Sequence, residues 1–267
     1  MSNVRLFFAK SLLIVEGDAE NILLPTIARL LGRPLEDYGV SVINVGNTAY
    51  ARFAKIFLRK EEGEFIPINI SCIRDLDLWP VKAEVGVSTY GFKERLQPNE
   101  KGQGGNLKYW VDQTPPEDKK TELKDLEEEK LKVFVSDEWT FEYCLIRSGL
   151  KELIYKALGK DETELTKLKG DEEDAAIYVY DLIENTKGAK TEVAYQLASM
   201  LEKEFGAKGK KQELREALPK YILEALEHVT FKWPDNLDQP VTIEETPQEG
   251  AEQNNEQPAQ NEDAISG

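Results

Sequence analysis

Four acidic residues follow two short apolar runs of the sequence, in spacings that suit a shared task. Glu16 comes directly after the apolar run 11–15, and Glu20 lies four residues later; Asp75 and Asp77 follow a second apolar run and are two residues apart. Residues four apart share one face of a helix, and residues two apart share one side of an extended chain. Each pair can therefore direct two carboxylates towards one place.

Carboxylates crowded into one cleft repel each other and raise each other's pKa values, so such a group is favourable chiefly when divalent cations neutralise it. Glu142 follows a later apolar run, at the start of a predicted helix, and would add a fifth carboxylate. Oxygen ligands favour Mg²⁺ or Mn²⁺. Two such ions about 3.5–4 Å apart are a common arrangement for cleaving phosphodiesters. The pattern predicts phosphoryl chemistry that depends on two divalent ions.

Each pair also has a simpler interpretation. Asp18 and Glu20 alone would be first-turn acids, which the helix dipole favours. Asp75 and Asp77 alone would be a pair of loop acids after a strand. The order of a glutamate pair, then a strand, then an aspartate pair is more specific than either pair by itself.

The elements that must position these acids alternate between two patterns. Short apolar runs at 11–17, 39–46 and 66–77 are separated by amphipathic segments at 19–32 and 47–63. This order predicts an α/β fold with a parallel central sheet covered by helices, in which ligands bind at the carboxyl ends of the strands. Later segments continue the pattern and predict a helix at 121–131, a strand followed by a helix at 132–146, and helices at 190–206 and 211–231.

The organisation along the chain is predicted from composition and from the positions of turn-forming residues. The expected regions are a core at 1–150 with an excursion at 81–130, a charged helical insertion at 151–186, returning helices at 187–233 that complete the core, and a disordered acidic tail at 234–267. The tail has nine acids and neither lysine nor arginine. Such a composition cannot bury enough apolar surface to fold.

The overall composition excludes several classes of protein. The chain has 267 residues, with 34 Lys and Arg against 50 Asp and Glu and a formal charge of −16, so a DNA partner would meet an unfavourable long-range field unless basic patches or bound cations reverse it locally. The two cysteines have neither zinc-site spacing nor a disulfide framework. No signal sequence follows Met1, and no apolar run approaches the roughly 20 residues of a membrane span. We expect a cytoplasmic protein with no membrane partner.

Several segments together resemble a known family. "VEGDAE" at 15–20 and "RDLDLWP" at 74–80 resemble the TOPRIM domain that topoisomerases, primases and certain nucleases share. The segments 5–25, 39–47 and 133–145 more closely resemble the OLD (overcoming lysogenization defect) nucleases, which are related to the nuclease of the Gabija anti-phage system. The resemblance extends over roughly residues 5–200 and is specific, since several segments match in order. It implies a Rossmann-like TOPRIM domain with a parallel central sheet and a helical insertion domain.

The resemblance also implies roles for the acids. They are expected to bind Mg²⁺ or Mn²⁺ through Glu16, Glu20, Asp75, Asp77 and Glu142. Glu16 and Asp75 are expected to act in catalysis with a lysine near the start of a later helix, for which Lys190 is the first candidate and Lys187 the competing one. This lysine would stabilise charge on the phosphate or orient the attacking water, and the simpler alternative is an exposed lysine before a helix. Arg74 either approaches the phosphate or pairs with a neighbouring acid.

The function that the resemblance implies is that of a divalent-metal-dependent DNA endonuclease or nickase in phage defence. Such nucleases carry an amino-terminal ABC-type ATPase domain, yet this sequence has no nucleotide-binding motif, so it resembles the carboxy-terminal half alone. The resemblance leaves open whether the protein forms a homodimer. The alternatives are another TOPRIM activity, either topoisomerase-like or in RNA processing, and a non-catalytic regulatory or protein-binding module.

Overall fold

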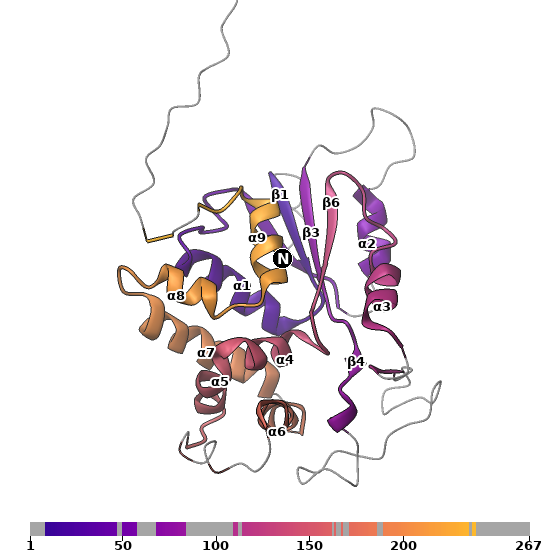
Figure 1. The fold of residues 1–267 in the computed structure, drawn as a ribbon. Helices are drawn as coiled ribbons and strands as arrows, with labels where there is room; N and C mark the ends of the chain where they lie inside the picture. The colour runs from indigo at the N-terminus through magenta and orange to yellow at the C-terminus, as the bar shows by residue number, and fades with distance from the viewer. Residues whose placement is uncertain are drawn as a thin grey trace, which may run out of the picture.

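The central element is a four-stranded parallel sheet with the strand order β2-β1-β3-β6 (Figure 1). The computed structural model describes residues 9–46, 50–57, 68–83, 109–111, 114–161, 163, 167, 171–185, 189–234 and 237–238. The four strands are β1 (Ser11–Val15), β2 (Val40–Asn44), β3 (Asn69–Arg74) and β6 (Leu131–Val135). The α/β fold with a parallel sheet that the alternating pattern predicts is therefore confirmed.

Strand β1 lies in the middle of the sheet, which explains its uninterrupted apolar sequence. All five of its residues are buried. Leu12 and Ile14 belong to one hydrophobic cluster, and Leu13 and Val15 belong to the other. Because successive side chains of a strand point to opposite faces, a strand covered on both faces needs apolar residues at every position.

Helices cover both faces of the sheet. On one face lie α1 (Asp18–Leu30) and α9 (Lys220–Val229); on the other lie α2 (Tyr50–Phe57) and α3 (Pro116–Leu123) (Figure 1). Helix α9 packs against β3, β6 and β1 although it is the last helix in the described part of the chain. The Ser71 hydroxyl of β3 donates a hydrogen bond to the carbonyl oxygen of Ala225 at 2.8 Å, which fixes α9 on the sheet.

A second group of helices lies beyond the carboxyl ends of the strands (Figure 1). Its members are α4 (Phe141–Leu145), a π-helical turn at Ile146–Leu150, α5 (Lys151–Ala157), α6 (Glu172–Asn185) and α7 (Ala189–Phe205). Helix α7 packs along α1 and also contacts α5 and α6. This packing brings the start of α7 close to the ends of the strands.

Three local expectations are wrong. The helix predicted at 121–131 is α3 (Pro116–Leu123), which begins earlier because Pro116 suits a first helical position. The helix predicted at 211–231 is two helices, α8 (Lys211–Glu216) and α9, because Pro219 lacks the N–H group and disfavours helix at the residue before it. The chain is not extended through Asp77, whose φ of 58° lies in the left-handed region.

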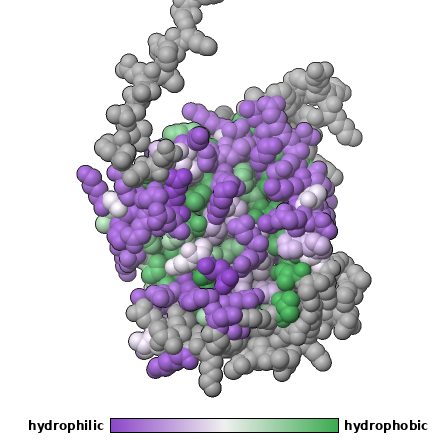
Figure 2. Space-filling model, in the orientation of Figure 1, coloured by the Kyte–Doolittle hydropathy of each residue, from purple (hydrophilic) through white to green (hydrophobic). Residues whose placement is uncertain are grey.

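Two short strands, β4 (Leu78–Trp79) and β5 (Tyr109–Trp110), pair in parallel, and a 3₁₀ turn spans Val81–Ala83. Lys187, most of the excursion at 81–130 and nearly all of the acidic tail lie outside the described residues. The face seen in Figure 2 is hydrophilic over most of its described surface. In the described part of the chain, no helix combines the length and the apolar character that crossing a bilayer requires.

Candidate metal centre

The candidate site is built where three neighbouring strands end. Strands β1, β3 and β6 are adjacent and parallel, so their carboxyl ends meet at one edge of the sheet. Glu16 directly follows β1, and Asp75 directly follows β3. After β6 the chain turns, and the Thr140 side chain accepts a hydrogen bond from the backbone of Tyr143, which caps α4 and places Glu142 in its first turn.

Glu20 lies in the first turn of α1 and folds back over the turn that precedes the helix. Its side chain is buried, with 5% of the residue exposed. A Cβ atom at Gly17 would lie 2.6 Å from Oε2 of Glu20. The backbone of Gly17 is extended, so the space taken by the carboxylate, and not the backbone conformation, calls for glycine at this position.

Asp75 joins β3 to the start of α4. Its Oδ1 accepts a hydrogen bond from the backbone N–H of Phe141 at 2.7 Å. This bond ties the carboxylate to the helix turn that carries Glu142. Asp77 is exposed, and its backbone N–H donates to the carbonyl oxygen of Trp139 at 2.8 Å, so the left-handed turn at Asp77 is also held against the segment before α4.

The acids act on one another electrostatically. Burial, followed by the charges of Glu142 and Glu16, raises the pKa of Glu20 to about 8. Burial also raises the pKa of Asp75 well above its ordinary value, with further contributions from all four other acids of the predicted site. The structure thus brings the five predicted acids into one electrostatic environment.

A cation lies beside each end of this group of acids. Nε of Arg74 donates to Oε1 of Glu16 at 2.8 Å, and the Arg74 guanidinium lies over the ring of Tyr50 at 4.4 Å from its centroid. Burial raises the pKa of Glu16, and the charge of Arg74 partly offsets this effect. Of the two alternatives for Arg74, the structure has the pairing with an acid.

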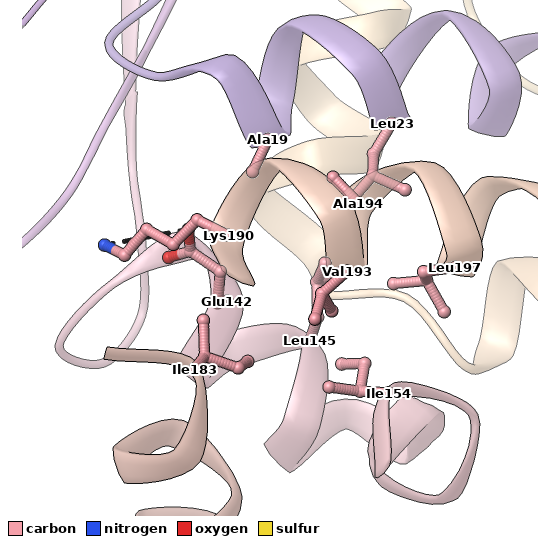
Figure 3. A pocket seen from close by; sticks show the side chains of 10 residues that line it. All are labelled: Ala19, Leu23, Glu142, Leu145, Ile154, Ile183, Lys190, Val193, Ala194 and Leu197. Atoms are coloured by element: carbon pink, nitrogen blue, oxygen red, sulfur yellow. Dashed lines mark ion pairs between the residues drawn. The ribbon is translucent and has the colours of Figure 1, made fainter. Parts of the chain in front are cut away.

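The second cation is Lys190, in the first turn of α7. Its Nζ lies 2.6 Å from Oε1 of Glu184 and 3.9 Å from Oε1 of Glu142. Figure 3 shows the Lys190 and Glu142 side chains next to each other, joined by a dashed line, at the edge of a small pocket. The other residues that line this pocket are apolar and come from α1, α4, α5, α6 and α7: Ala19, Leu23, Leu145, Ile154, Ile183, Val193, Ala194 and Leu197.

The carboxylate oxygens of the candidate site are chemically suited to bind a divalent cation. Buried carboxylates with raised pKa values are stabilised by a nearby positive charge, and oxygen atoms are the ligands that Mg²⁺ and Mn²⁺ prefer. Over the described residues, however, no three Asp, Glu, His or Cys side chains are grouped closely enough to hold an ion as they stand. Arg74 and Lys190 lie against two of the acids instead. Binding an ion therefore requires side chains to rearrange.

Two residues at this site were missed by the sequence analysis. Glu184 contacts Lys190, and the Tyr180 hydroxyl donates to Oε1 of Glu184 at 2.9 Å. The signal in the sequence is weak: Tyr180 and Glu184 are four residues apart and therefore lie on one face of α6, shortly before Lys190. Their contact with Lys190 depends on how α6 meets α7, which local spacing does not reveal.

The sequence of residues 7–77 matches a family model described as the TOPRIM domain of proteins like the overcoming lysogenization defect (OLD) protein. Residues 7–77 are an OLD-like TOPRIM domain. The resemblance seen in the sequence is confirmed for this part of the chain, as is the TOPRIM fold that it implied. The TOPRIM domain contains Glu16, Glu20, Asp75 and Asp77; Glu142 and Lys190 lie beyond the matched residues.

The solved structures that are similar to the chain include two C-terminal regions of OLD proteins. The C-terminal region of the OLD protein of Xanthomonas campestris pv. campestris is 23% identical, with 84% of this chain and 94% of that chain covered and a TM-score of 0.48. The C-terminal region of the OLD protein of Burkholderia pseudomallei is 22% identical, with 84% and 98% covered and a TM-score of 0.49. No curated protein matches the sequence.

Proposed function

We propose that the chain is a DNA endonuclease or nickase that depends on Mg²⁺ or Mn²⁺ and cleaves phosphodiesters with two ions. The OLD-like TOPRIM domain supports a nuclease-type, metal-binding module. The observation that carries the finer proposal is the electrostatic coupling of five acids at the ends of three adjacent strands, with a lysine beside them. Burial and neighbouring acids raise the pKa values of Glu16, Glu20 and Asp75, and a divalent cation would relieve the repulsion within such a group.

In this proposal the ions are held, directly or through water, by Glu16, Glu20, Asp75, Asp77 and Glu142. When bound, two Mg²⁺ or Mn²⁺ ions supply an activated water and stabilise the charge on the leaving oxygen. Asp75 keeps its place because the Phe141 N–H holds one of its oxygens. The Glu20 carboxylate lies over Gly17 in space that a Cβ atom at that position would partly take.

Lys190 has the second role in the proposal. Its ammonium group carries a full positive charge at neutral pH, because the carboxylates of Glu142 and Glu184 raise its pKa against the opposing effect of burial. A fixed positive charge next to the acids can stabilise the negative charge that develops on a phosphate in the transition state. Lys187, the alternative candidate, lies outside the described residues.

The proposal is tested with supercoiled plasmid DNA and the Asp75→Asn variant. We expect nicked or linear products with Mg²⁺ or Mn²⁺, none with EDTA, and a loss of about 100-fold or more in rate for the variant, because asparagine retains the acceptor for Phe141 but loses the charge. Asp18→Asn is the control, because Asp18 is an exposed first-turn acid bonded to Asn44 and should retain its activity. Full activity of Asp75→Asn would contradict the proposal.

The second candidate is a non-catalytic binding module. The observation that favours it is that Arg74 and Lys190 already lie against acids of the site, and no three metal-ligating side chains are grouped over the described residues. A ligand that binds only the folded state must raise the melting temperature. Intact plasmid together with a melting temperature that Mg²⁺ and Mn²⁺ leave unchanged would favour this candidate.

The resemblance to OLD proteins also suggests an ABC-type ATPase domain as a partner. In this extension of the proposal, ATP would control when the acids meet DNA. The test is to add such a domain and ATP to the plasmid assay. Cleavage that rises with both additions would support the partner, and an unchanged rate would count against it.

A further inference from the structure

Lys190 lies between two carboxylates and is closer to the one that does not belong to the predicted metal site. Its Nζ is 2.6 Å from Oε1 of Glu184 and 3.9 Å from Oε1 of Glu142. Glu142 comes from α4, whereas Glu184 comes from the last turn of α6. The ammonium group is therefore drawn towards α6 and stays just short of a close contact with Glu142.

Glu184 is itself held in place by a buried tyrosine. The Tyr180 hydroxyl donates a hydrogen bond to the same oxygen of Glu184 that contacts Lys190, at 2.9 Å. Tyr180 is 4% exposed, and its ring lies against Trp139 at a centroid distance of 4.3 Å and edge-on to Tyr143 at 6.1 Å. Packing of this kind leaves the hydroxyl little freedom, so the position of the Glu184 carboxylate is set by the core.

We propose that Glu184 and Tyr180 are positioning residues that hold the Lys190 ammonium group away from Glu142 and so leave the Glu142 carboxylate available to a divalent cation. This inference rests on the proposed function, in which Glu142 is a ligand. It gives helix α6 a role in the site, through two residues four apart on one face.

The physical reason is the competition between two cations for one carboxylate. The charges of Glu142 and Glu184 are the two that act most strongly on Lys190, and without Glu184 only the pull of Glu142 would remain at that strength. The ammonium group would then move into direct contact with Glu142, where it would both occupy an oxygen and repel an incoming ion. Over distances of a few ångströms the interaction of two unit charges is large enough to change an ion's affinity several-fold, even where water screens part of it.

The inference is tested by measuring Mn²⁺ binding to the purified protein, with free Mn²⁺ followed by electron paramagnetic resonance. We expect Glu184→Gln to weaken binding about three- to tenfold. Tyr180→Phe keeps the ring and loses only the hydroxyl, so it should weaken binding about two- to threefold. Glu192→Gln is the matched control. It removes one exposed acid from the first turn of α7, the helix that carries Lys190, and should leave binding unchanged.

A second background shows whether the effect acts through the lysine. In a Lys190→Met protein, Glu184→Gln should have no effect on Mn²⁺ affinity, because no ammonium group remains to be redirected. An equal loss in both backgrounds would overturn the inference, as would a Glu184→Gln protein that binds Mn²⁺ like Glu192→Gln. Circular dichroism should show the same fold for wild type and Glu184→Gln in both backgrounds, because Glu184 is exposed.

These outcomes separate the inference from the function on which it rests. A wild-type protein that binds no Mn²⁺ would overturn the proposed function and the inference together. A wild-type protein that binds Mn²⁺ with no difference between Glu184→Gln and the control would overturn the inference alone. In the cleavage assay, Glu184→Gln should raise the Mn²⁺ concentration needed for half the maximal rate, whereas the rate at saturating Mn²⁺ should change less.

Discussion

Glu20 is the residue at which burial and charge conflict most clearly. A carboxylate that is 5% exposed, close to two other acids, loses the hydration that would stabilise its charge. Its pKa of about 8 means that at neutral pH much of the protein holds a proton on this side chain. A site of this kind is costly to the folded state unless a cation or a proton occupies it.

This conflict predicts how stability depends on pH. Between pH 4.5 and 8 the folded state retains a proton on Glu20 that the unfolded chain has released, so the free energy of unfolding falls as pH rises through this range. In the Glu20→Gln variant this side chain does not titrate, so it causes no such fall in the free energy of unfolding. Its melting temperature should equal that of the wild type near pH 4.5 and exceed it by about 10–20 °C at pH 8.5, measured by calorimetry without divalent ions.

Asp18→Asn is the control for this pH series, because Asp18 is exposed and bonds to Asn44. Its melting temperature should follow that of the wild type throughout. A gap between Glu20→Gln and the wild type that stays constant from pH 4.5 to 8.5 would contradict the assignment of the effect to Glu20.

Arg74, in contrast to Glu20, stabilises the protein when no divalent ion is bound. Its ion pair with Glu16 is partly buried, with 21% and 11% of the two side chains exposed, and its guanidinium also stacks on Tyr50. Arg74→Gln leaves Glu16 without this cation, so the protein without divalent ions should lose about 1–3 kcal/mol of stability. The same variant should gain more from Mn²⁺ than the wild type does, because the ion no longer displaces an arginine.

Arg147→Gln provides the comparison for the Arg74 prediction. Arg147 pairs with Glu138, but 33% and 45% of these side chains are exposed, so the loss should stay below about 1 kcal/mol. Denaturant unfolding with and without Mn²⁺ measures both quantities. Equal losses for the two arginine variants would show that the Arg74 pair has no special importance.

At the scale of elements, the turn from β1 into α1 controls where Glu20 lies. The Gly17→Ala variant keeps the backbone conformation, since φ and ψ there are in the extended region that any residue adopts. The new methyl group would lie 2.6 Å from Oε2 of Glu20 and must displace it. We expect the fold to persist, with Mn²⁺ affinity and cleavage reduced about tenfold.

A double variant isolates the cause of the Gly17 effect. In a Glu20→Ala protein no carboxylate remains to be displaced, so adding Gly17→Ala should not reduce Mn²⁺ affinity any further. A further loss in that background would mean that the methyl group acts on the turn itself.

The strands and their acids could be predicted from the sequence because the signal is local. The runs that become β1 and β3 are apolar until the residue where an acid or an arginine ends them, and parallel strands place such ends at one edge. The break between α8 and α9 was also visible in the sequence at Pro219, but the apolar period continues across it and suggested one helix.

The cations of the site could not be predicted in the same way. Glu184 and Lys190 meet because α7 packs along α1 and α6 contacts α7. Arg74 meets Glu16 because the neighbouring strands β3 and β1 end side by side. These contacts depend on side-chain packing between elements that are distant in the sequence. A pattern of spacing within one element does not contain that information.

At the scale of the whole molecule, the net charge of −16 means that the proposed nuclease would need divalent ions for DNA binding as well as for chemistry. Without them the acids of the site and the DNA backbone repel each other. A Lys190→Ala protein, which should keep its ions and lose cleavage, should bind a labelled duplex at least about tenfold more tightly in Mg²⁺ than in EDTA, measured by fluorescence anisotropy at fixed ionic strength. Equal binding in both buffers would contradict this expectation.

Helix α9 has a consequence for how the molecule is made. The sheet face that β3 presents is sealed by a helix more than 140 residues further along the chain, through the Ser71 bond to Ala225 and a bond from the Asn69 side chain to the carbonyl oxygen of His228 at 2.9 Å. While the ribosome is still adding the residues between them, that apolar face has no cover of its own. The nascent chain therefore cannot cover this face of the sheet until α9 has left the exit tunnel. Until then the exposed apolar surface is available to chaperones.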